Sequence, residues 1–279
     1  MGNLIMENDI EYLYHYTSIE SLALILKNRT IRLNALNKMD DLQEQKTQDV
    51  LNFGQFFFVS SWTDEDKESI PMWKMYTSTS SGVRIKLRKN PFKRQKTKLS
   101  EFAKNIKARS VNVVTEQAEI DTLLDLGELI KKKVFSIDAW QGNILKEVIY
   151  TNDKEFLEPK IKSEDGMQLL YDKIGKYKDL HWKFQKEWRY LMKFIPLDML
   201  GSPSDILLKF QILGAKILEG TETMPFSYID LEIEKEYFEE MEITPSPQMS
   251  VGYKIVLDSL LEKYNPKAII KESELIGLI

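Results

Sequence analysis

One of only two histidines in the 279 residues, His15, lies where a predicted strand runs into a predicted helix. Successive side chains of a strand point to opposite faces, so His15 shares a face with Thr17 and turns away from the neighbouring tyrosines. An imidazole at such a junction is able to hydrogen-bond a ligand or to move a proton near neutral pH. The alternative is a core histidine that donates to a nearby carbonyl, and the motif alone leaves both interpretations open.

The segment after His15 carries a helix-start pattern. The order Thr17, Ser18, Ile19, Glu20 places a hydroxyl three residues before a glutamate and just before an apolar run. This pattern is typical of a capping box, in which the Thr17 hydroxyl caps the helix and Glu20 reaches back. We therefore expect the histidine to lie beside the start of a helix.

A carboxylate and a phenol are the other candidates for chemistry. Glu187 opens an alternating segment and shares a strand face with Arg189, opposite an aromatic face. Tyr76 lies in a short predicted helix that places Trp73 on the same helix face. Each has a plain structural alternative. Glu187 would meet Arg189 or a cross-strand lysine in an ion pair, and Tyr76 would make a core contact.

The composition excludes several kinds of chemistry. The chain has no cysteine, which excludes disulfides, thiol nucleophiles and thiolate metal sites. Its two distant histidines argue against a zinc or iron centre, so we expect no metal. No apolar run approaches eighteen residues, and the first residues show no signal-peptide pattern. We therefore expect a cytoplasmic protein with no membrane partner.

The net charge of -4 hides an uneven distribution. Eight basic residues and no acidic one lie between Arg84 and Lys98, whereas the segment 219–242 carries almost only acidic charges. A basic run either contacts the phosphates of a nucleic acid or forms a solvated face, and the sequence leaves both open.

The hydrophobic pattern predicts an α+β fold, because the predicted strands do not alternate regularly with helices. We expect one domain over residues 1–279, with residues 90–180 as a helical or irregular insertion. The predicted strands cover 11–16, 30–34, 55–61, 83–88, 144–150, 187–194, 206–213, 215–219, 240–244 and 267–270. The predicted helices cover 18–28, a short one from Pro71, about 116–140, 164–184 and 250–264.

Several segments together resemble a bacterial family, the one numbered twenty-nine seventy-one among domains of unknown function. They are His15-Tyr16-Thr17, Ile31-Arg32-Leu33 with Asp40-Asp41 and Glu44, Phe58-Val59-Ser60-Ser61, Met72-Trp73-Lys74-Met75-Tyr76, Gly82-Val83-Arg84-Ile85, Glu187-Trp188-Arg189, Ile243-Thr244-Pro245 and Lys271-Glu272-Ser273. Their order covers most of the chain, and residues 90–180 match least.

That family in turn resembles the His-Tyr-Glu branch of the ADP-ribosyltransferases, which split NAD between nicotinamide and ribose. The resemblance implies a split β-sheet core with peripheral helices, and NAD as substrate. It implies catalytic roles for Glu187, His15 and Tyr76. The residues that it implies for cofactor binding are Tyr16, Thr17, Arg32, Ser60, Trp73 and Arg189. Two positions depart from the pattern, since Tyr16 replaces a glycine and Trp73 replaces a small residue of the pocket floor.

In this resemblance Glu187 would stabilise the positive charge that builds on the ribose as the glycosidic bond breaks. His15 would donate to the adenosine-side ribose, and Tyr76 would stack on the nicotinamide ring. Arg32, Arg84 or Lys86 would hold the pyrophosphate, and the sequence does not choose among them.

Three functions remain open at this point. The first is an NAD-dependent ADP-ribosyltransferase or NAD-cleaving effector, acting as a toxin or in phage defence on a protein or nucleic-acid acceptor. The second is a non-catalytic module that binds NAD or an ADP-ribose-like nucleotide. The third is a nucleic-acid-processing relative of the RNA 2'-phosphotransferases.

Overall fold

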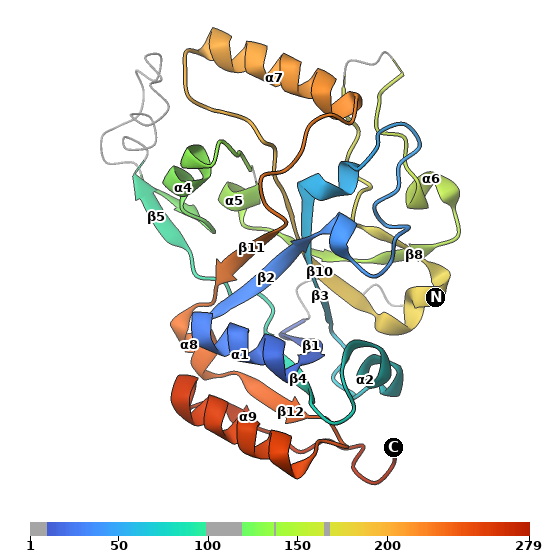
Figure 1. Ribbon diagram of the computed structural model, residues 1–279, viewed down its shortest axis with the longest axis vertical. Coiled ribbons are helices and arrows are strands. Elements are labelled where there is room, and N and C mark those ends of the chain that lie inside the picture. Colours follow the sequence, from blue (N-terminus) through green and yellow to red (C-terminus); the bar gives the residue numbers. More distant parts are fainter. Residues whose placement is uncertain (1–9, 99–118, 137, 165–167) are drawn as a thin grey trace.

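The computed structural model describes residues 10–98, 119–136, 138–164 and 168–279, and a mixed β-sheet forms its centre (Figure 1). Along one path the strands follow in the order β11 (Tyr228–Glu232), β2 (Thr30–Ala35), β3 (Phe57–Thr63), β1 (Tyr12–Ser18), β4 (Gly82–Arg88), β12 (Glu242–Pro245) and β13 (Ile269–Ile270). The strand β10 (Glu187–Lys193) pairs with β3 and with β7 (Leu145–Glu147). Among the described strands of this sheet only β12 and β13 pair in parallel, which confirms the predicted α+β class.

The sheet divides along one edge of β3. On its other edge β3 pairs with β10 over its whole length. On the divided edge the first half of β3 pairs with β2, through Asn34 with Val59, and its last residue pairs with β1, through Tyr14 with Thr63. No described strand pairs with residues 60–62 on this edge. The strands β1 and β2, which α1 (Ile19–Asn28) joins, therefore meet β3 at its two ends and leave a gap between them.

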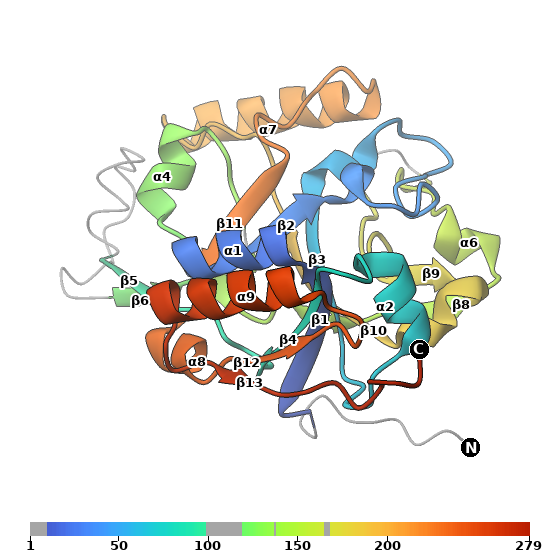
Figure 2. The ribbon, with the colours of Figure 1, turned by 60° about the horizontal axis from the view of Figure 1, so that its bottom comes forward.

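Two hydrophobic clusters hold the elements together. In the larger, α1 and α9 (Val251–Tyr264) lie side by side over the sheet (Figure 2) and contribute Leu22 and Leu257 to a core with Trp62 and Ile85. In the smaller cluster, α7 (Pro203–Leu218) packs through Leu213.

Shorter elements surround the sheet. The helices are α2 (Ile70–Tyr76), α4 (Leu126–Lys131), α5 (Asp138–Gln141), α6 (Lys154–Leu157) and α8 (Lys235–Glu239), with the 3-10 helices η2 (Leu36–Lys38), η3 (Phe53–Phe56) and η4 (Leu180–Gln185). Two strand pairs lie outside the central sheet, β5 (Gln95–Lys98) with β6 (Glu119–Thr122) and β8 (Ile149–Thr151) with β9 (Tyr177–Asp179).

The strongly periodic elements were predicted correctly. The strands predicted at 11–16, 30–34, 55–61, 83–88, 187–194 and 240–244 are confirmed, with their ends moved by up to two residues. The helix predicted at 250–264 and the short one from Pro71 are also confirmed. In these segments the hydrophobic period and the local start signal point to the same element.

Four predicted elements, in three segments, were wrong. The strands predicted at 206–213 and 215–219 form one helix, α7, whose capping box between Ser202 and Asp205 outweighs the apolar run. The helix predicted at 164–184 is instead β9 and η4, and Gly175 with its positive φ interrupts it. In the helix predicted at 116–140, residues 119–122 form β6 and two short helices follow. Of these segments, residues 116–118, 137 and 165–167 lie outside the described residues.

The helix start after His15 also differs in one residue. Thr17 belongs to β1, and the cap is Ser18, whose hydroxyl accepts the Ser21 backbone N–H at 3.2 Å. The predicted capping box between Thr17 and Glu20 is therefore wrong. A strand that continues one residue further shifts the cap by the same step, because the N-cap residue is the first outside the helix.

The uneven charge distribution is resolved by pairing. Within the basic block, Lys86, Arg88 and Lys93 form ion pairs with glutamates of the acidic segment, at positions 242, 240 and 232. Arg84 is buried at 4% exposure. The two runs of opposite charge thus lie against each other in the fold, and much of the positive charge is already matched.

Candidate functional site

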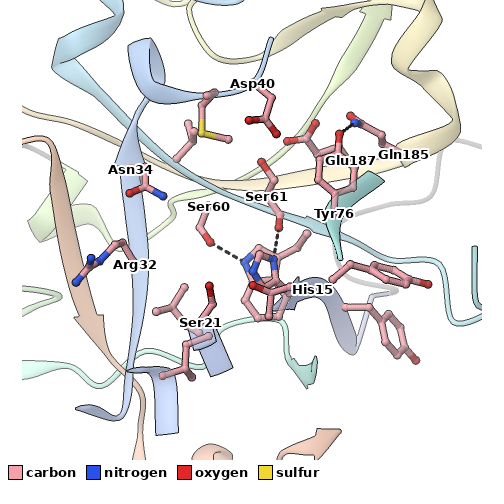
Figure 3. A pocket seen from close by; sticks show the side chains of 18 of the residues that line it. His15, Ser21, Arg32, Asn34, Asp40, Ser60, Ser61, Tyr76, Gln185 and Glu187 are labelled. Carbon is pink, nitrogen blue, oxygen red and sulfur yellow. Dashed lines mark hydrogen bonds between the residues drawn. The ribbon is translucent and has the colours of Figure 1, made fainter. Parts of the chain in front are cut away.

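A cleft of about 380 Å³ lies in the gap between β1 and β2 (Figure 3). Cavities of this size are typical of small-molecule sites. The strands β1, β2 and β3 form its walls together with α1, while α2, η4 and the first residue of β10 close one end. His15, Tyr76 and Glu187 all line this cleft, although they come from β1, α2 and β10. The fold therefore brings together the three side chains that the sequence singled out as candidates for catalysis.

His15 bridges the divided edge of β3. Its Nδ1 lies 2.8 Å from the carbonyl oxygen of Ser61, and because a carbonyl only accepts, Nδ1 carries the proton. Burial lowers the pKa of His15 below its usual value, and the Ser61 carbonyl only partly opposes this shift. The ring is therefore neutral near pH 7 and its Nε2 is an acceptor. The predicted role as a donor is corrected, since the ring would accept a hydrogen bond from a ligand hydroxyl.

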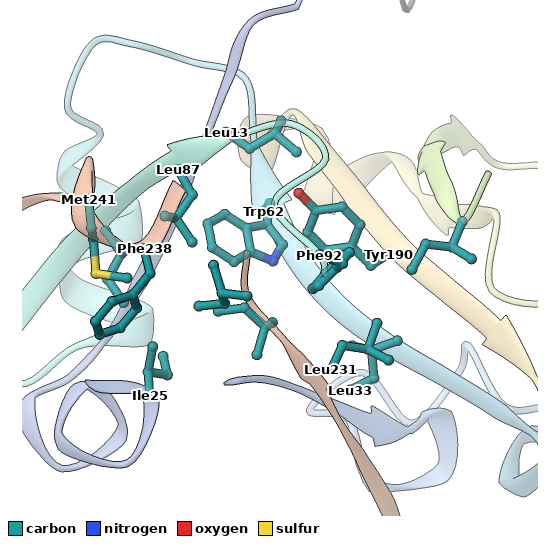
Figure 4. Close-up of a cluster of buried hydrophobic side chains, with 14 of the residues drawn as sticks. Leu13, Ile25, Leu33, Trp62, Leu87, Phe92, Tyr190, Leu231, Phe238 and Met241 are labelled. Carbon is teal, nitrogen blue, oxygen red and sulfur yellow. The ribbon is translucent and has the colours of Figure 1, made fainter. Parts of the chain in front are cut away.

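The ring of His15 rests on the core. It lies 4.9 Å from the ring of Trp62, which packs between Leu87 and Tyr190 in the larger cluster (Figure 4). The indole N–H of Trp62 donates to the Ser60 hydroxyl at 3.0 Å. The core thus holds the histidine and the first serine of this wall in place, and the plain alternative of a core histidine bonded to a carbonyl describes part of the arrangement.

Glu187 is buried in a network of four charges. Its carboxylate accepts from Arg189 Nε at 2.5 Å and from Lys178 Nζ at 2.9 Å. Glu44 forms ion pairs with the same two cations. Burial acts to raise the pKa of Glu187, but the charges of Arg189 and Lys178 outweigh it and lower that pKa to about 2. The carboxylate therefore stays ionised over the physiological range.

This network agrees in its partners with the plain alternative for Glu187, an ion pair with Arg189 and a lysine. It differs in its burial, because the side chains of Glu187 and Arg189 are 3% and 0% exposed. Such a pair costs more to break than a surface pair, since the partner left behind would be an unpaired buried charge. The network of four charges still borders the cleft, because Glu187, Lys178 and Glu44 are among the residues that line the cleft.

Tyr76 stands at the same end of the cleft. Its hydroxyl oxygen accepts a hydrogen bond from the side-chain amide of Gln185. Burial, followed by the negative charge of Glu187, raises the pKa of Tyr76, so the phenol stays protonated at neutral pH. Gln185 in turn accepts from Lys178 Nζ at 2.8 Å, which joins the phenol to the charge network.

Two of the predicted cofactor-binding residues do not line the cleft. Arg189 is fully buried behind Glu187, where it also donates to the Gly175 carbonyl. Trp73 is buried on α2, and its indole N–H donates to Glu68 at 2.9 Å. Both predictions are corrected. The bulky indole is accommodated because it packs against the ring of Tyr16 and bonds Glu68 in the loop before α2, away from the cleft.

Tyr16 is among the residues that line the cleft, but its ring and hydroxyl make their contacts on the opposite face of β1. Its ring meets Trp73 edge to face at 5.0 Å, and its hydroxyl accepts the Ser69 backbone N–H at 3.0 Å. On the same face Arg84 lies 3.9 Å from the ring of Tyr14. Tyr16 therefore positions the start of α2, the helix that carries Tyr76.

The remaining residues predicted to bind the cofactor line the cleft, and one of them already pairs with another side chain. Thr17 and Ser60 lie in its walls. Arg32 also lines it, but its guanidinium binds Asp230 through two hydrogen bonds of 2.8 and 2.9 Å. Of the three cations considered for a pyrophosphate, only Arg32 is at the cleft, because Arg84 and Lys86 lie elsewhere on the sheet.

Sequence reasoning missed two residues of the site. Lys178 and Gln185 both line the cleft and are 6% and 4% exposed. Lys178 was placed within the predicted polar helix at 164–184, and Gln185 lay between that helix and the strand predicted at 187–194. Gln185 is the last residue of η4, and Lys186 with its positive φ separates it from β10, so a strand alternation with Glu187 was not a signal for it. Lys178 carried no signal either, because its partner Glu44 is distant in the chain.

Comparison with known proteins gives one match. Residues 72–190 match the model of a family described as a protein of unknown function (DUF2971). The matched span contains Tyr76, Lys178, Gln185 and Glu187, whereas His15 precedes it. This part of the chain therefore supports the resemblance to that domain of unknown function. No curated protein and no solved structure matches the chain.

The described residues contain no group of three or more histidine, aspartate or glutamate side chains placed to hold a metal ion. Among the helices that the structure describes, none has the length and apolar character needed to span a bilayer.

Proposed function

We propose that the cleft between β1 and β2 binds NAD and that the protein cleaves it at the nicotinamide glycosidic bond, as an ADP-ribosyltransferase or NAD glycohydrolase. The observation that carries this proposal is the meeting of His15, Tyr76 and Glu187 in one cleft of ligand size. The divided edge of β3 adds support, since the ADP-ribosyltransferase resemblance implies a split β-sheet core.

Each side chain has a role that its geometry allows. The neutral His15 offers Nε2 to a ribose hydroxyl, because Nδ1 is occupied by the Ser61 carbonyl. Glu187 is ionised and would stabilise the oxocarbenium-like charge on the ribose. Tyr76 offers an aromatic face for the nicotinamide ring, a contact of roughly 0.5–1.5 kcal/mol beyond burial.

The test is nicotinamide release from NAD by the purified protein, measured by chromatography. Glu187→Gln should lower the rate at least a hundredfold, on the order of 3 kcal/mol in the barrier, if electrostatic stabilisation is the main effect. The matched control is Glu44→Gln, which removes one negative charge from the same buried network at a cleft-lining position to which the proposal gives no role in bond cleavage. If both variants lose the same activity, Glu187 acts only through the stability of the network.

A second candidate is a module that binds NAD or an ADP-ribose-like nucleotide without turnover. One observation favours it, since both oxygens of the Glu187 carboxylate already accept from cations. The positive charges of Lys178 and Arg189 oppose the field that Glu187 would direct at the ribose. Saturable binding of NAD without nicotinamide release would identify this second function and reject the first.

A further inference from the structure

The direction of the hydrogen bonds at the end of the cleft follows from Lys178. An ammonium group has three donors and no acceptor, so the Gln185 atom 2.8 Å from Lys178 Nζ must be the amide oxygen. The amide nitrogen therefore faces the other way, toward Tyr76. Lys178 and Gln185 are both more than nine-tenths buried, which holds this arrangement in a single orientation.

The orientation of the amide decides the orientation of the phenol. Because the Gln185 nitrogen donates, the Tyr76 oxygen accepts, and its own proton has to point elsewhere. Within the described residues, no hydrogen bond from that hydroxyl to another side chain or carbonyl is formed. The nearby Glu187 carboxylate already accepts from Arg189 and Lys178.

We propose that Lys178, acting through the Gln185 amide, orients the Tyr76 hydroxyl as a hydrogen-bond donor toward the cleft. The cleft then selects a ligand that presents an oxygen acceptor at this wall. Lys178 and Gln185 are positioning residues for ligand recognition, and Tyr76 makes the contact. The inference rests on the proposed function in one respect, since NAD, whose carboxamide and ribose oxygens are acceptors of this kind, is the ligand used to measure it.

The test is a double-mutant cycle on NAD affinity, measured by titration calorimetry. Tyr76→Phe removes the donor and should weaken binding about tenfold, the usual effect of one lost hydrogen bond of roughly 1.4 kcal/mol. Gln185→Met keeps the length of the side chain without its polar atoms and should weaken binding three- to tenfold. In the Tyr76→Phe background Gln185→Met should change the affinity less than twofold, because its effect passes through the hydroxyl.

Two outcomes would overturn the inference. The first is full additivity of the two substitutions in folded variants, as checked by circular dichroism. The second is an unchanged NMR signal of the Gln185 side-chain amide in Tyr76→Phe, because that amide then does not contact the hydroxyl. The NMR measurement needs no ligand. If NAD fails to bind, the proposed function falls, while the amide signal still decides whether Gln185 contacts and orients the phenol.

Discussion

At the scale of single residues, the site depends on opposite charges that share one buried volume. Glu187 and Glu44 would each be costly to bury alone, and each is matched by the same two cations. The pairing holds the carboxylate of Glu187 ionised and gives it one orientation. It also occupies both oxygens, so the same contacts that position the group reduce its negative field at the cleft.

The stability of the protein should depend on pH through Glu187. Its folded pKa, about 2, is below the unfolded value near 4.5, so its contribution is full above pH 4.5 and is lost as the pH falls toward 2. The shift corresponds to a contribution on the order of 3 kcal/mol. Urea unfolding at pH 6 and pH 3 should show a smaller loss of stability in Glu187→Gln than in the wild type.

The control for this measurement is Asp172→Asn, which removes an exposed carboxylate outside the network. This variant should keep the wild-type dependence on pH. Equal curves for Glu187→Gln and the wild type would show that Glu187 gains nothing from its cations on folding.

At the scale of elements, the cleft arises where strands stop pairing. The divergence of β1 and β2 leaves the carbonyl of Ser61 without a strand partner on that edge, and His15 supplies the missing donor. At the other end, Lys186 adopts a left-handed backbone with φ of 44° and turns the chain from η4 into β10. This turn brings Gln185 and Glu187 to the same end of the cleft.

The start of α1 offers a test at this scale. Ser18→Ala should destabilise the protein by about 1 kcal/mol, since the Ser21 N–H loses its acceptor. Glu20→Gln should cost only a few tenths of a kcal/mol, because Glu20 merely favours the helix dipole in the first turn. Chemical denaturation of both variants measures the difference. Equal losses of stability in the two variants would support the predicted capping box with Glu20, which the structure does not show.

At the scale of the whole molecule, the cleft is assembled from distant parts of the chain. Residues between Tyr14 and Asp230 line it, and the C-terminal segment braces α2, where Ser273 Oγ donates to Glu68 at 2.6 Å. Glu68 also accepts from Trp73 on that helix. Only the folded chain unites these groups, so a ligand of the cleft binds the native state and not the unfolded one.

NAD should therefore stabilise the protein against thermal unfolding. At a concentration one hundred times its Kd the gain is about 2.7 kcal/mol, which raises Tm by several degrees. Differential scanning fluorimetry with NAD, ADP-ribose and nicotinamide would show which part of the dinucleotide supplies the gain. An unchanged Tm at millimolar NAD would contradict the assignment of the cleft to this ligand.

The sequence by itself determined the local elements and the candidates. The alternation around His15 and Glu187 predicted two strands, and the resemblance pointed to Tyr76 as their partner. The two strand predictions are confirmed, because period and propensity act between near neighbours. Tertiary structure alone decided that β1 and β2 part from β3, that the basic block meets the acidic one, and that Lys178 reaches both Glu44 and Glu187. Such contacts mostly join residues far apart in the chain, and local sequence patterns do not predict the partners of a long-range ion pair.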